Sequence, residues 1–446
     1  MKNENLWKVL GITLLSIILL TWIIPTSNFD GIAINRGQVT PTGYWDIFGS
    51  IGIAISYFWQ PGVFILFVGG FYGVANKTGA TKSLVDKLKK GFKGREKKFL
   101  IFSIAFFMIT ASLTAIYLPL FIFVPLFMAV ILSMGYSKMV ALLCTVGSII
   151  IGSISLMYNT ALYQALQVDI VPNVWHKLLL LNLSLAITIF YVWKTAEIKK
   201  GKQKEEIDAA MLFIESEKES KSFKNAALPL FITFIVLFVL FVTAMIPWTA
   251  MLGVEVFSNF YEAVMGVEII GFPIFQNILG ETLPPFGYWT TSDLLGLIFL
   301  AVIVLALTYK LKLQETIESF VDGAKKVGPT ALLVVLINIA IVFSLNSGFY
   351  TTIMNYLVTL TEGLNVLTMS INTFLGSVLV VDRVYMANYI MSISNSILPA
   401  DAPVFLLTLI GQTMYGTAML IAPTSVVLLA GLSYLEVPYT SWVKYI

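Results

Sequence analysis

Long apolar runs alternate with short polar or charged stretches along the whole chain. About 18 consecutive apolar residues are needed to cross a bilayer core of about 30 Å, and runs of this kind recur from the first residues to the last. We expect apolar helices or groups of helices at residues 6–25, 99–134, 139–156, 178–193, 227–247, 293–309 and 328–436. The pattern predicts an all-α, polytopic transmembrane protein.

Some of these runs are interrupted in a way that is typical of broken helices. The run at 99–134 is too long for one straight helix and contains Pro119 and Pro125. Because proline removes a backbone donor and clashes inside a helix, we expect a helix followed by a broken or re-entrant element. The runs at 139–156 and 178–193 are separated by the polar insert MYNTALYQALQVDIVPN. Broken helices are typical of secondary transporters, which bind substrate near the bilayer midplane.

Charged stretches divide the chain. Residues 77–98 contain nine Lys or Arg and two acids, which predicts a cytoplasmic segment and, with it, a cytoplasmic N-terminus. Residues 194–225 carry charges of both signs and predict a solvent-exposed linker. We therefore expect a first transmembrane repeat at 1–193, a charged cytoplasmic linker at 194–225 and a second transmembrane repeat at 226–446.

The two halves echo each other, which indicates an internal duplication. The matching segments occur in the same order in both halves: PTGYWDIFGSIG at 41–52 with PFGYWTTSDLLG at 285–296, then SLVDKLKK at 83–90 with SFVDGAKK at 319–326. Counting Lys and Arg favours two parallel halves, because the basic segment and the linker are both placed inside. The precedent of secondary transporters favours inverted halves. The sequence leaves this choice open.

Composition agrees with a membrane protein and excludes several other classes. The chain is 58% hydrophobic and 12% charged, whereas soluble domains carry about twice that charged fraction. The first apolar run lacks a small-residue cleavage pattern, so we interpret it as a retained helix rather than a signal peptide. Cys144 is the single cysteine and cannot form an intrachain disulfide. His176 lies beside Trp175, which favours an interfacial anchor over a proton relay.

Soluble-type active-site chemistry has no support in the sequence. The net charge of +3 does not suggest a nucleic-acid partner. We find no metal-ligand cluster, Gly-rich phosphate loop or nucleophile motif in the sequence. We therefore expect no enzyme activity and no cofactor or metal, apart from a coupling proton or sodium ion.

Four stretches resemble the YfcC family of membrane carriers, which is related to the anaerobic C4-dicarboxylate carrier DcuC in the ion transporter superfamily. They span the chain in order: LTWIIPTSNFDG in the first run, FVGGFYGVANKTGA at 67–80, FVDGAKKVGPTALLVVL from Phe320, and APTSVVLLAGLSYLEVPYTSWVKY at the end. The resemblance implies a scaffold domain that is usually dimeric and a moving domain with two re-entrant hairpins. It also implies elevator-type alternating access, driven by a proton or sodium gradient or by exchange. Family substrates include dicarboxylates and amino acids.

The chain departs from the family where specificity is expected. Relatives have a Glu-Glu pair in the first hairpin, where this chain has Ala115 and Ile116 in LTAIYLPLF. Relatives have Ser-Gly-Ser-Gly-Gln in the second hairpin, where this chain reads FLGSVLVVDRVYMANY. The resemblance therefore predicts the architecture but does not carry over the substrate.

Asp382 and Arg383 are the sharpest candidates for a binding site. Charged residues inside a spanning segment normally face protein or a water-filled cavity, and they mark transport pathways. Neighbours on a helix point in different directions, so we expect separate partners for the two. Arg383 could bind a substrate carboxylate, and Asp382 could hold a proton, a sodium ion or a substrate amine. The alternatives are bridges between helices or a hairpin tip near the interface.

Further polar residues in apolar surroundings complete the predicted substrate site, each with a structural alternative. Asn76 falls in the family motif and could instead cap a helix. Asn159 and Thr160 could coordinate a cation or lie in a polar surface loop. Side chains in the last apolar run could instead bond to neighbouring helices. These candidates in the last run are Gln412, Thr424 and Ser425.

The sequence thus predicts a secondary active transporter of a small polar metabolite, either an amino acid or an organic anion such as a dicarboxylate. We expect a multi-pass protein of the cell membrane that works by elevator-type alternating access. Its expected partners are a small-molecule substrate, the lipid bilayer and a second copy in a homodimer. The alternative is a non-transporting membrane sensor or scaffold derived from a carrier. A membrane-embedded enzyme would need clustered acid, base or metal-binding groups, which the sequence does not supply.

Overall fold

The computed structural model describes residues 4–30, 34–157, 159–168, 174–198, 226–360, 365–380, 382–397 and 404–446. Most of the predicted linker, residues 199–225, lies outside this part of the chain. The described residues include eight stretches that are long and apolar enough to cross a membrane. The predicted all-α polytopic fold is therefore confirmed.

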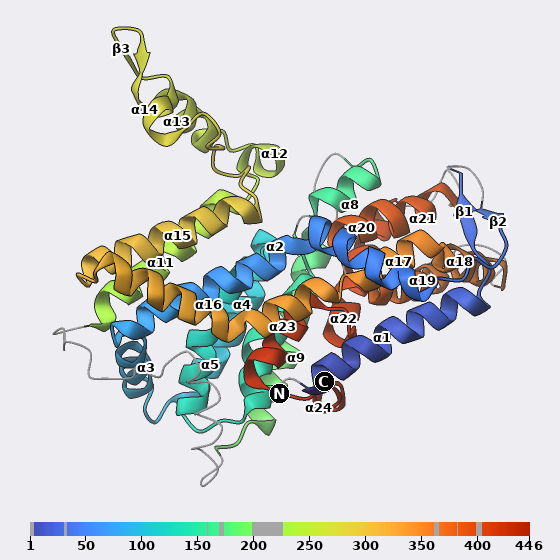
Figure 1. Ribbon diagram of the computed structural model, residues 1–446, viewed down its shortest axis with the longest axis horizontal. Helices are drawn as coiled ribbons and strands as arrows, with labels where there is room; N and C mark the ends of the chain where they lie inside the picture. Colours follow the sequence, from blue (N-terminus) through green and yellow to red (C-terminus); the bar gives the residue numbers. More distant parts are fainter. Residues whose placement is uncertain are drawn as a thin grey trace.

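The first half begins with a long helix and a short two-stranded sheet, and then alternates long helices with short helical pieces (Figure 1). Its elements are α1 (Glu4–Ile23), β1 (Ser27–Phe29), β2 (Ile34–Arg36), α2 (Tyr44–Lys77), α3 (Ala80–Gly91), α4 (Glu96–Thr114), η1 (Pro119–Ile122), α5 (Val124–Ser133), α6 (Lys138–Leu142), η2 (Leu143–Gly147), α7 (Ser148–Ser153), α8 (Thr160–Ala165) and α9 (Val174–Thr195). The strands β1 and β2 pair antiparallel.

The second half adds an arm that projects from the α11–α15 pair (Figure 1). The elements up to the end of this pair are α11 (Ala227–Met245), α12 (Trp248–Leu252), α13 (Val256–Met265), β3 (Glu268–Ile269), β4 (Phe272–Pro273), α14 (Ile274–Leu279) and α15 (Thr291–Thr308). The remaining elements are α16 (Leu313–Leu336), α17 (Ile339–Ser347), α18 (Phe349–Leu360), α19 (Val366–Leu379), α20 (Arg383–Tyr385), η4 (Met386–Met391), α21 (Ser392–Ile397), α22 (Val404–Ile421), α23 (Val426–Leu435) and α24 (Tyr439–Tyr445).

The same order of elements occurs twice. In the first half, α2 leads through Gly79, whose φ is 70°, into the 12-residue helix α3. In the second half, α16 and α17 lead through Gly348, whose φ is 61°, into the 12-residue helix α18. Glycine suits both junctions because it adopts positive φ without a steric cost. A helical hairpin and then an interrupted helix follow each junction.

The two hairpins are built from antiparallel arms. In the first hairpin, α4 packs on α5, and ring contacts join Phe106 to Phe123 and Phe102 to Phe127. In the second hairpin, α19 packs on the return segment of α20, η4 and α21, where Thr373 contacts Met391. The interrupted helices are α6, η2 and α7 followed by α8 in the first half, and α22 followed by α23 in the second.

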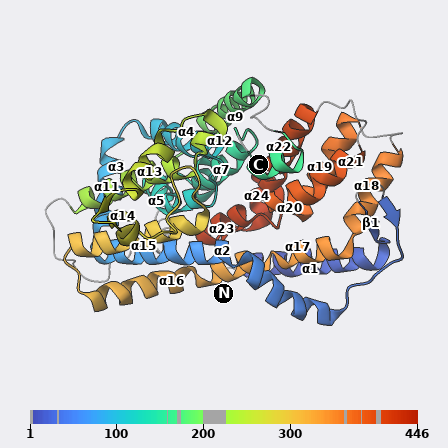
Figure 2. The same ribbon diagram turned by 90° about the horizontal axis from the view of Figure 1, so that it is seen from above.

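Helices α2 and α16 pack side by side along the length of the molecule (Figure 2). The contacts run in opposite order along the two helices: Gly62 lies against Ala331, Gly69 against Gly323, and Gly73 against Ser319. The helices are therefore antiparallel. A Cβ atom at Gly323 would lie 2.1 Å from the Gly69 carbonyl oxygen. Small residues of this kind let membrane helices approach to backbone contact.

The sequence echoes do not coincide with this structural recurrence. Residues 83–90 lie in the short helix α3, whereas residues 319–326 lie inside the long helix α16. The counterpart of α3 by position is α18, which follows Gly348 as α3 follows Gly79. The division into repeats at 1–193 and 226–446 stays a prediction.

Adding a methyl group to the α2–α16 contact should destabilise the protein. We expect Gly323→Ala to lower the free energy of unfolding by about 1–3 kcal/mol, because overpacking forces backbone shifts. Gly328→Ala in the same helix is the control, since a Cβ there meets nothing within 4 Å. Thermal unfolding of both variants in detergent measures the difference, and equal midpoints would contradict the proposed close contact.

Candidate substrate-binding site

The first hairpin turns through an unwound segment between α4 and η1. Helix α4 ends where Ala115 adopts the left-handed conformation with φ 53°, which is uncommon for residues other than glycine, asparagine and aspartate. Pro119 then begins η1, where a missing N–H costs no helical hydrogen bond. The turn leaves the Ala115 carbonyl outside the helix, where a side chain can bond to it.

The second hairpin reverses direction between the end of α19 and the start of α20. Helix α19 ends at Leu379, and the backbone of Asp382 is extended. The Asp382 Oδ1 atom accepts hydrogen bonds from the Val384 and Tyr385 N–H groups at 2.9 and 3.0 Å. Aspartate is among the best residues for capping a helix start in this way. Asp382 therefore begins the return arm of the hairpin.

Arg383 joins the tips of the two hairpins. Its Nη1 donates to the Ala115 carbonyl oxygen at 3.1 Å, across 268 positions of sequence. The guanidinium carbon lies 5.4 Å from the centre of the Tyr117 ring, which is within the range of a cation–π contact. The Nε atom is buried and bonds to no described residue. Within the described ranges, no carboxylate forms an ion pair with Arg383.

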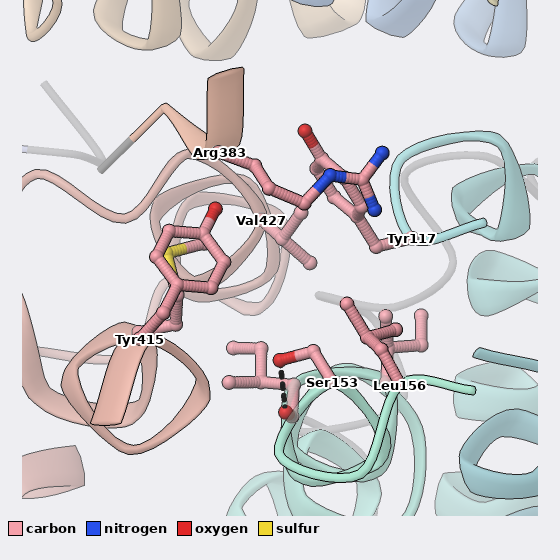
Figure 3. A pocket seen from close by; sticks show the side chains of 9 residues that line it. Tyr117, Ser153, Leu156, Arg383, Tyr415 and Val427 are labelled. Carbon is pink, nitrogen blue, oxygen red and sulfur yellow. Dashed lines mark hydrogen bonds between the residues drawn. The ribbon is translucent and has the colours of Figure 1, made fainter. Parts of the chain in front are cut away.

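A small cavity lies beside this guanidinium. Figure 3 shows Tyr117, Tyr415 and Arg383 around it, with Ser153 and Leu156 on the opposite wall. Ser153 bonds to the Ile150 carbonyl oxygen at 2.6 Å. The rest of the lining is apolar and comprises Ile149, Ile150, Met419 and Val427. The cavity has a volume of about 10 Å³, which is close to the space that one water molecule needs.

Side-chain hydrogen bonds join the interrupted helix α22–α23 to the second hairpin and to the interruption between α7 and α8. Thr424 Oγ1, between α22 and α23, donates to the Val378 carbonyl oxygen of the second hairpin at 2.7 Å. Gln412 Nε2 on α22 donates at 2.6 Å to the Leu156 carbonyl oxygen, which lies between α7 and α8. The first turn of α23 borders the cavity through Val427. A helix N-terminus carries partial positive charge, so this turn adds to the field of Arg383.

Buried polar atoms without a hydrogen-bond partner gather around the second hairpin. Each such atom costs about 1–3 kcal/mol when it is left unsatisfied. Among the described residues they are Asn372 Nδ2 and Oδ1, Ser377 Oγ, Arg383 Nε, Gln412 Oε1, Thr413 Oγ1 and Ser425 Oγ near this hairpin, Asn159 Nδ2 at the start of α8, which packs against η4 and α20, and Asn76 Oδ1, Thr81 Oγ1 and Ser347 Oγ elsewhere. Unpaired donors and acceptors in one region are the groups that a polar ligand would satisfy.

Sequence comparison decides the class of the protein. A profile of the C4-dicarboxylate anaerobic carrier family, DcuC, matches residues 58–446. The chain belongs to this family. A search of curated proteins finds no significant match. Among solved structures the chain is similar to the YdaH transporter of Alcanivorax borkumensis, with 10% identity, a TM-score of 0.42, and coverage of 99% of this chain and 95% of that chain.

Membership of the DcuC family makes the chain a multi-pass membrane transporter rather than an enzyme, as the sequence predicts. The predicted relationship to DcuC is confirmed. The narrower assignment to the YfcC branch stays a prediction.

The structure brings only some of the predicted site residues of this DcuC-family carrier together. Arg383, Gln412 and Thr424 reach hairpin tips or the helix interruptions beside them. Ser425 is fully buried at the start of α23. Asp382 accepts hydrogen bonds from the backbone N–H groups of Val384 and Tyr385, and a direct binding role for it stays a prediction.

The other predicted residues do not line the Arg383 cavity, or their side chains are not described. Asn76 is at the end of α2, next to α3, on the opposite side of the molecule from α20 (Figure 1). Asn159 caps α8 by accepting from the Leu162 N–H at 3.3 Å. Thr160 is the first residue of α8, and its side chain lies outside the described part of the structure.

The structure adds residues that the sequence did not single out. Tyr117 and Tyr415 line the cavity, and both come from apolar runs in which an aromatic residue is unremarkable on pattern alone. Asn372 is fully buried in the outgoing arm of the second hairpin. Its signal in the sequence is a polar amide in the apolar run SINTFLGS, a short distance before Asp382.

The cap at Asp382 should depend on a side-chain oxygen rather than on charge. We expect Asp382→Asn to unfold at a temperature close to that of the wild type, because asparagine caps equally well. We expect Asp382→Ala to lose about 0.5–2 kcal/mol of stability. Asp322→Ala is the control, since Asp322 is a 69% exposed aspartate on α16. If Asn and Ala destabilise equally in thermal unfolding, the capping role is wrong.

Proposed function

We propose that the chain is a secondary active transporter of small carboxylates, with C4-dicarboxylates as the favoured class, and that Arg383 binds a substrate carboxylate. The observation that carries this proposal is a guanidinium at the meeting point of the hairpin tips, unpaired with any described carboxylate. Arg383 is half-buried, and its buried Nε has no hydrogen-bond partner. A partly desolvated charge without a counter-ion is costly, and an anionic substrate offsets this cost. The substrate class is the one for which the family is named.

Arg383 is suited to exchange its present acceptor for a carboxylate. The guanidinium carries five N–H donors in a planar fork that matches a carboxylate. Its Nη1 now bonds to a neutral acceptor, the Ala115 carbonyl oxygen. Hydrogen bonds between two charged groups are roughly twice as strong as neutral ones. A substrate carboxylate therefore displaces the carbonyl and releases the first hairpin tip from the second.

Substrate entry requires the hairpin tips to separate, because the cavity of about 10 Å³ is far smaller than a dicarboxylate. We propose that the hairpins and the interrupted helices move together in elevator-type alternating access. The bonds from Thr424 to the second hairpin and from Gln412 to the Leu156 carbonyl would hold these elements as one unit. The driving force is an ion gradient or exchange with a second metabolite.

The orientation and assembly of the protein are part of the same proposal. The nine Lys or Arg at residues 77–98 support a cytoplasmic position for this segment and for the N-terminus in a cell membrane. The four quoted sequence motifs support the YfcC branch of the family. The homodimer is proposed from the family resemblance alone.

Loss of the guanidinium should weaken carboxylate transport. We expect Arg383→Gln to raise the half-saturating concentration of succinate about 10- to 100-fold, because charged hydrogen bonds of about 1.5–3 kcal/mol are lost. Uptake into proteoliposomes measures this effect. Succinate should compete with the labelled substrate, and its uncharged diamide should not.

The matched control is Lys325→Gln, which removes the same charge from a lysine on α16 that is 73% exposed. If Arg383→Gln takes up succinate with the half-saturating concentration of the wild type, the assigned role of Arg383 is wrong. Amino acids also carry a carboxylate, so a panel of both classes decides the substrate. Succinate binding without flux in either direction would favour the sensor or scaffold alternative.

A further inference from the structure

Lys177 is a fully buried lysine near the start of α9. Its Nζ donates to the Met157 carbonyl oxygen at 3.2 Å and to the Tyr163 hydroxyl group. It also lies 4.9 Å from the centre of the Tyr163 ring. The Tyr163 hydroxyl donates its own proton to the Met157 carbonyl oxygen at 3.0 Å. The ammonium thus bonds to a neutral phenol and a backbone carbonyl.

The acceptor of Lys177 belongs to the interruption between α7 and α8. Three consecutive carbonyl groups of this segment accept bonds from side chains. Ser112 Oγ donates to the Ser155 oxygen at 2.7 Å, Gln412 Nε2 to the Leu156 oxygen at 2.6 Å, and Lys177 Nζ to the Met157 oxygen at 3.2 Å. In secondary transporters, the unwound carbonyls of interrupted helices commonly hold the coupling Na⁺ or H⁺. Lys177 places a positive charge at this type of position.

The charged groups of the neighbouring elements lie away from Lys177. Helix α9 packs against α4 and α7, and α7 contains no titratable residue. The charged residues of α4 are at its start, where Lys97 bonds to the Trp193 carbonyl. Trp193 is 16 positions along α9 from Lys177, or about 24 Å at 1.5 Å per residue. His176 is on the exposed side of α9, so Tyr163 is the titratable group that faces Lys177 among the described residues.

We propose that Lys177 is the coupling site of the carrier: its ammonium takes the place of a sodium ion at the α7–α8 interruption, and it carries the coupled proton. This inference deepens the proposed transport function and rests on it. A protonated Lys177 holds the Met157 carbonyl by a charge-assisted bond, which a neutral amine forms more weakly. Release of the proton therefore loosens the unwound segment.

The unwound segment connects Lys177 to the substrate cavity. Leu156, next to Met157, lines the cavity beside Arg383. The Met157 N–H donates at 2.9 Å to the Ser112 carbonyl oxygen of α4, in the first hairpin. Protonation at Lys177 thus acts on the same hairpin whose tip is bonded to Arg383. One proton per transport cycle follows from one lysine at the site.

The test is transport by the full chain in proteoliposomes with the membrane potential clamped at zero. An inward gradient of about one pH unit should drive about tenfold accumulation of succinate for one coupled proton. Replacing sodium by choline should leave the rate unchanged. Lys177→Arg keeps a cation that does not release its proton, so it should retain succinate counterflow and lose the stimulation by the pH gradient. Lys194→Gln, at the exposed far end of α9, is the control and should keep both.

A second measurement does not depend on substrate. The thermal midpoint of the wild type in detergent should be equal in sodium and choline. The thermal midpoint of Lys177→Gln should be higher in sodium than in choline, because the freed oxygens can bind the ion and ligand binding raises stability.

Sodium-driven uptake by the wild type, pH-driven accumulation by Lys177→Arg, or no sodium effect on the thermal midpoint of Lys177→Gln would each overturn the role of Lys177. Absence of succinate counterflow in the wild type would instead overturn the proposed function, and the sodium measurement would still decide whether Lys177 replaces the ion.

Discussion

A helix that is interrupted inside a membrane frees carbonyl groups, and these groups must find donors within the protein because lipid offers none. This constraint governs the centre of the DcuC-family chain. The donors are the side chains of Arg383, Thr424, Gln412 and Lys177, and the acceptors lie at the first hairpin tip, in the second hairpin and between α7 and α8. Two of the four donors are cations. The polar centre of the protein is thus organised by backbone oxygen atoms more than by side-chain pairs.

This arrangement links stability to function. Two of the donors that hold unwound carbonyls, Arg383 and Lys177, are charged groups. In the transport cycle that we propose, a carboxylate competes for Arg383, and a proton leaves or joins Lys177. When one of these bonds changes, a carbonyl must find a new partner, and the neighbouring segment must move. On this proposal, the hydrogen bonds that hold the unwound carbonyls in the described structure are the same bonds that change during transport.

The sequence predicts the helical membrane class well, because apolar runs of spanning length are a strong signal that needs no knowledge of tertiary contacts. It also predicts interruptions near Pro119 and between residues 156 and 178. It predicts that Asp382 and Arg383 have different partners, and the structure gives them different ones. It cannot name those partners, since the Ala115 carbonyl is 268 positions from Arg383 and carries no side-chain signal.

Lys177 illustrates the limit of sequence patterns in another way. A lysine close to a tryptophan at the start of an apolar helix, as Lys177 is to Trp175, is typical of an interfacial anchor that extends toward water. Only the fold shows that its side chain turns inward to Met157 and Tyr163. The echoing segments at 83–90 and 319–326 show a related limit, because similar residues occur in a short helix in one half and in a long helix in the other.

The contact between α2 and α16 has a mechanical consequence. Glycines on both helices bring the backbones together, and the Phe320 ring lies directly over Gly70. A slide by one residue, about 1.5 Å, would press side chains into backbone atoms, so the part of α2 that follows its kink at Phe58 resists sliding along α16. The chain leaves α2 through Gly79 and leaves α17, which continues from α16, through Gly348. Both glycines have positive φ, which glycine adopts without a steric cost. In the elevator mechanism that we propose, this pair of helices is the rigid scaffold against which the two hairpins move.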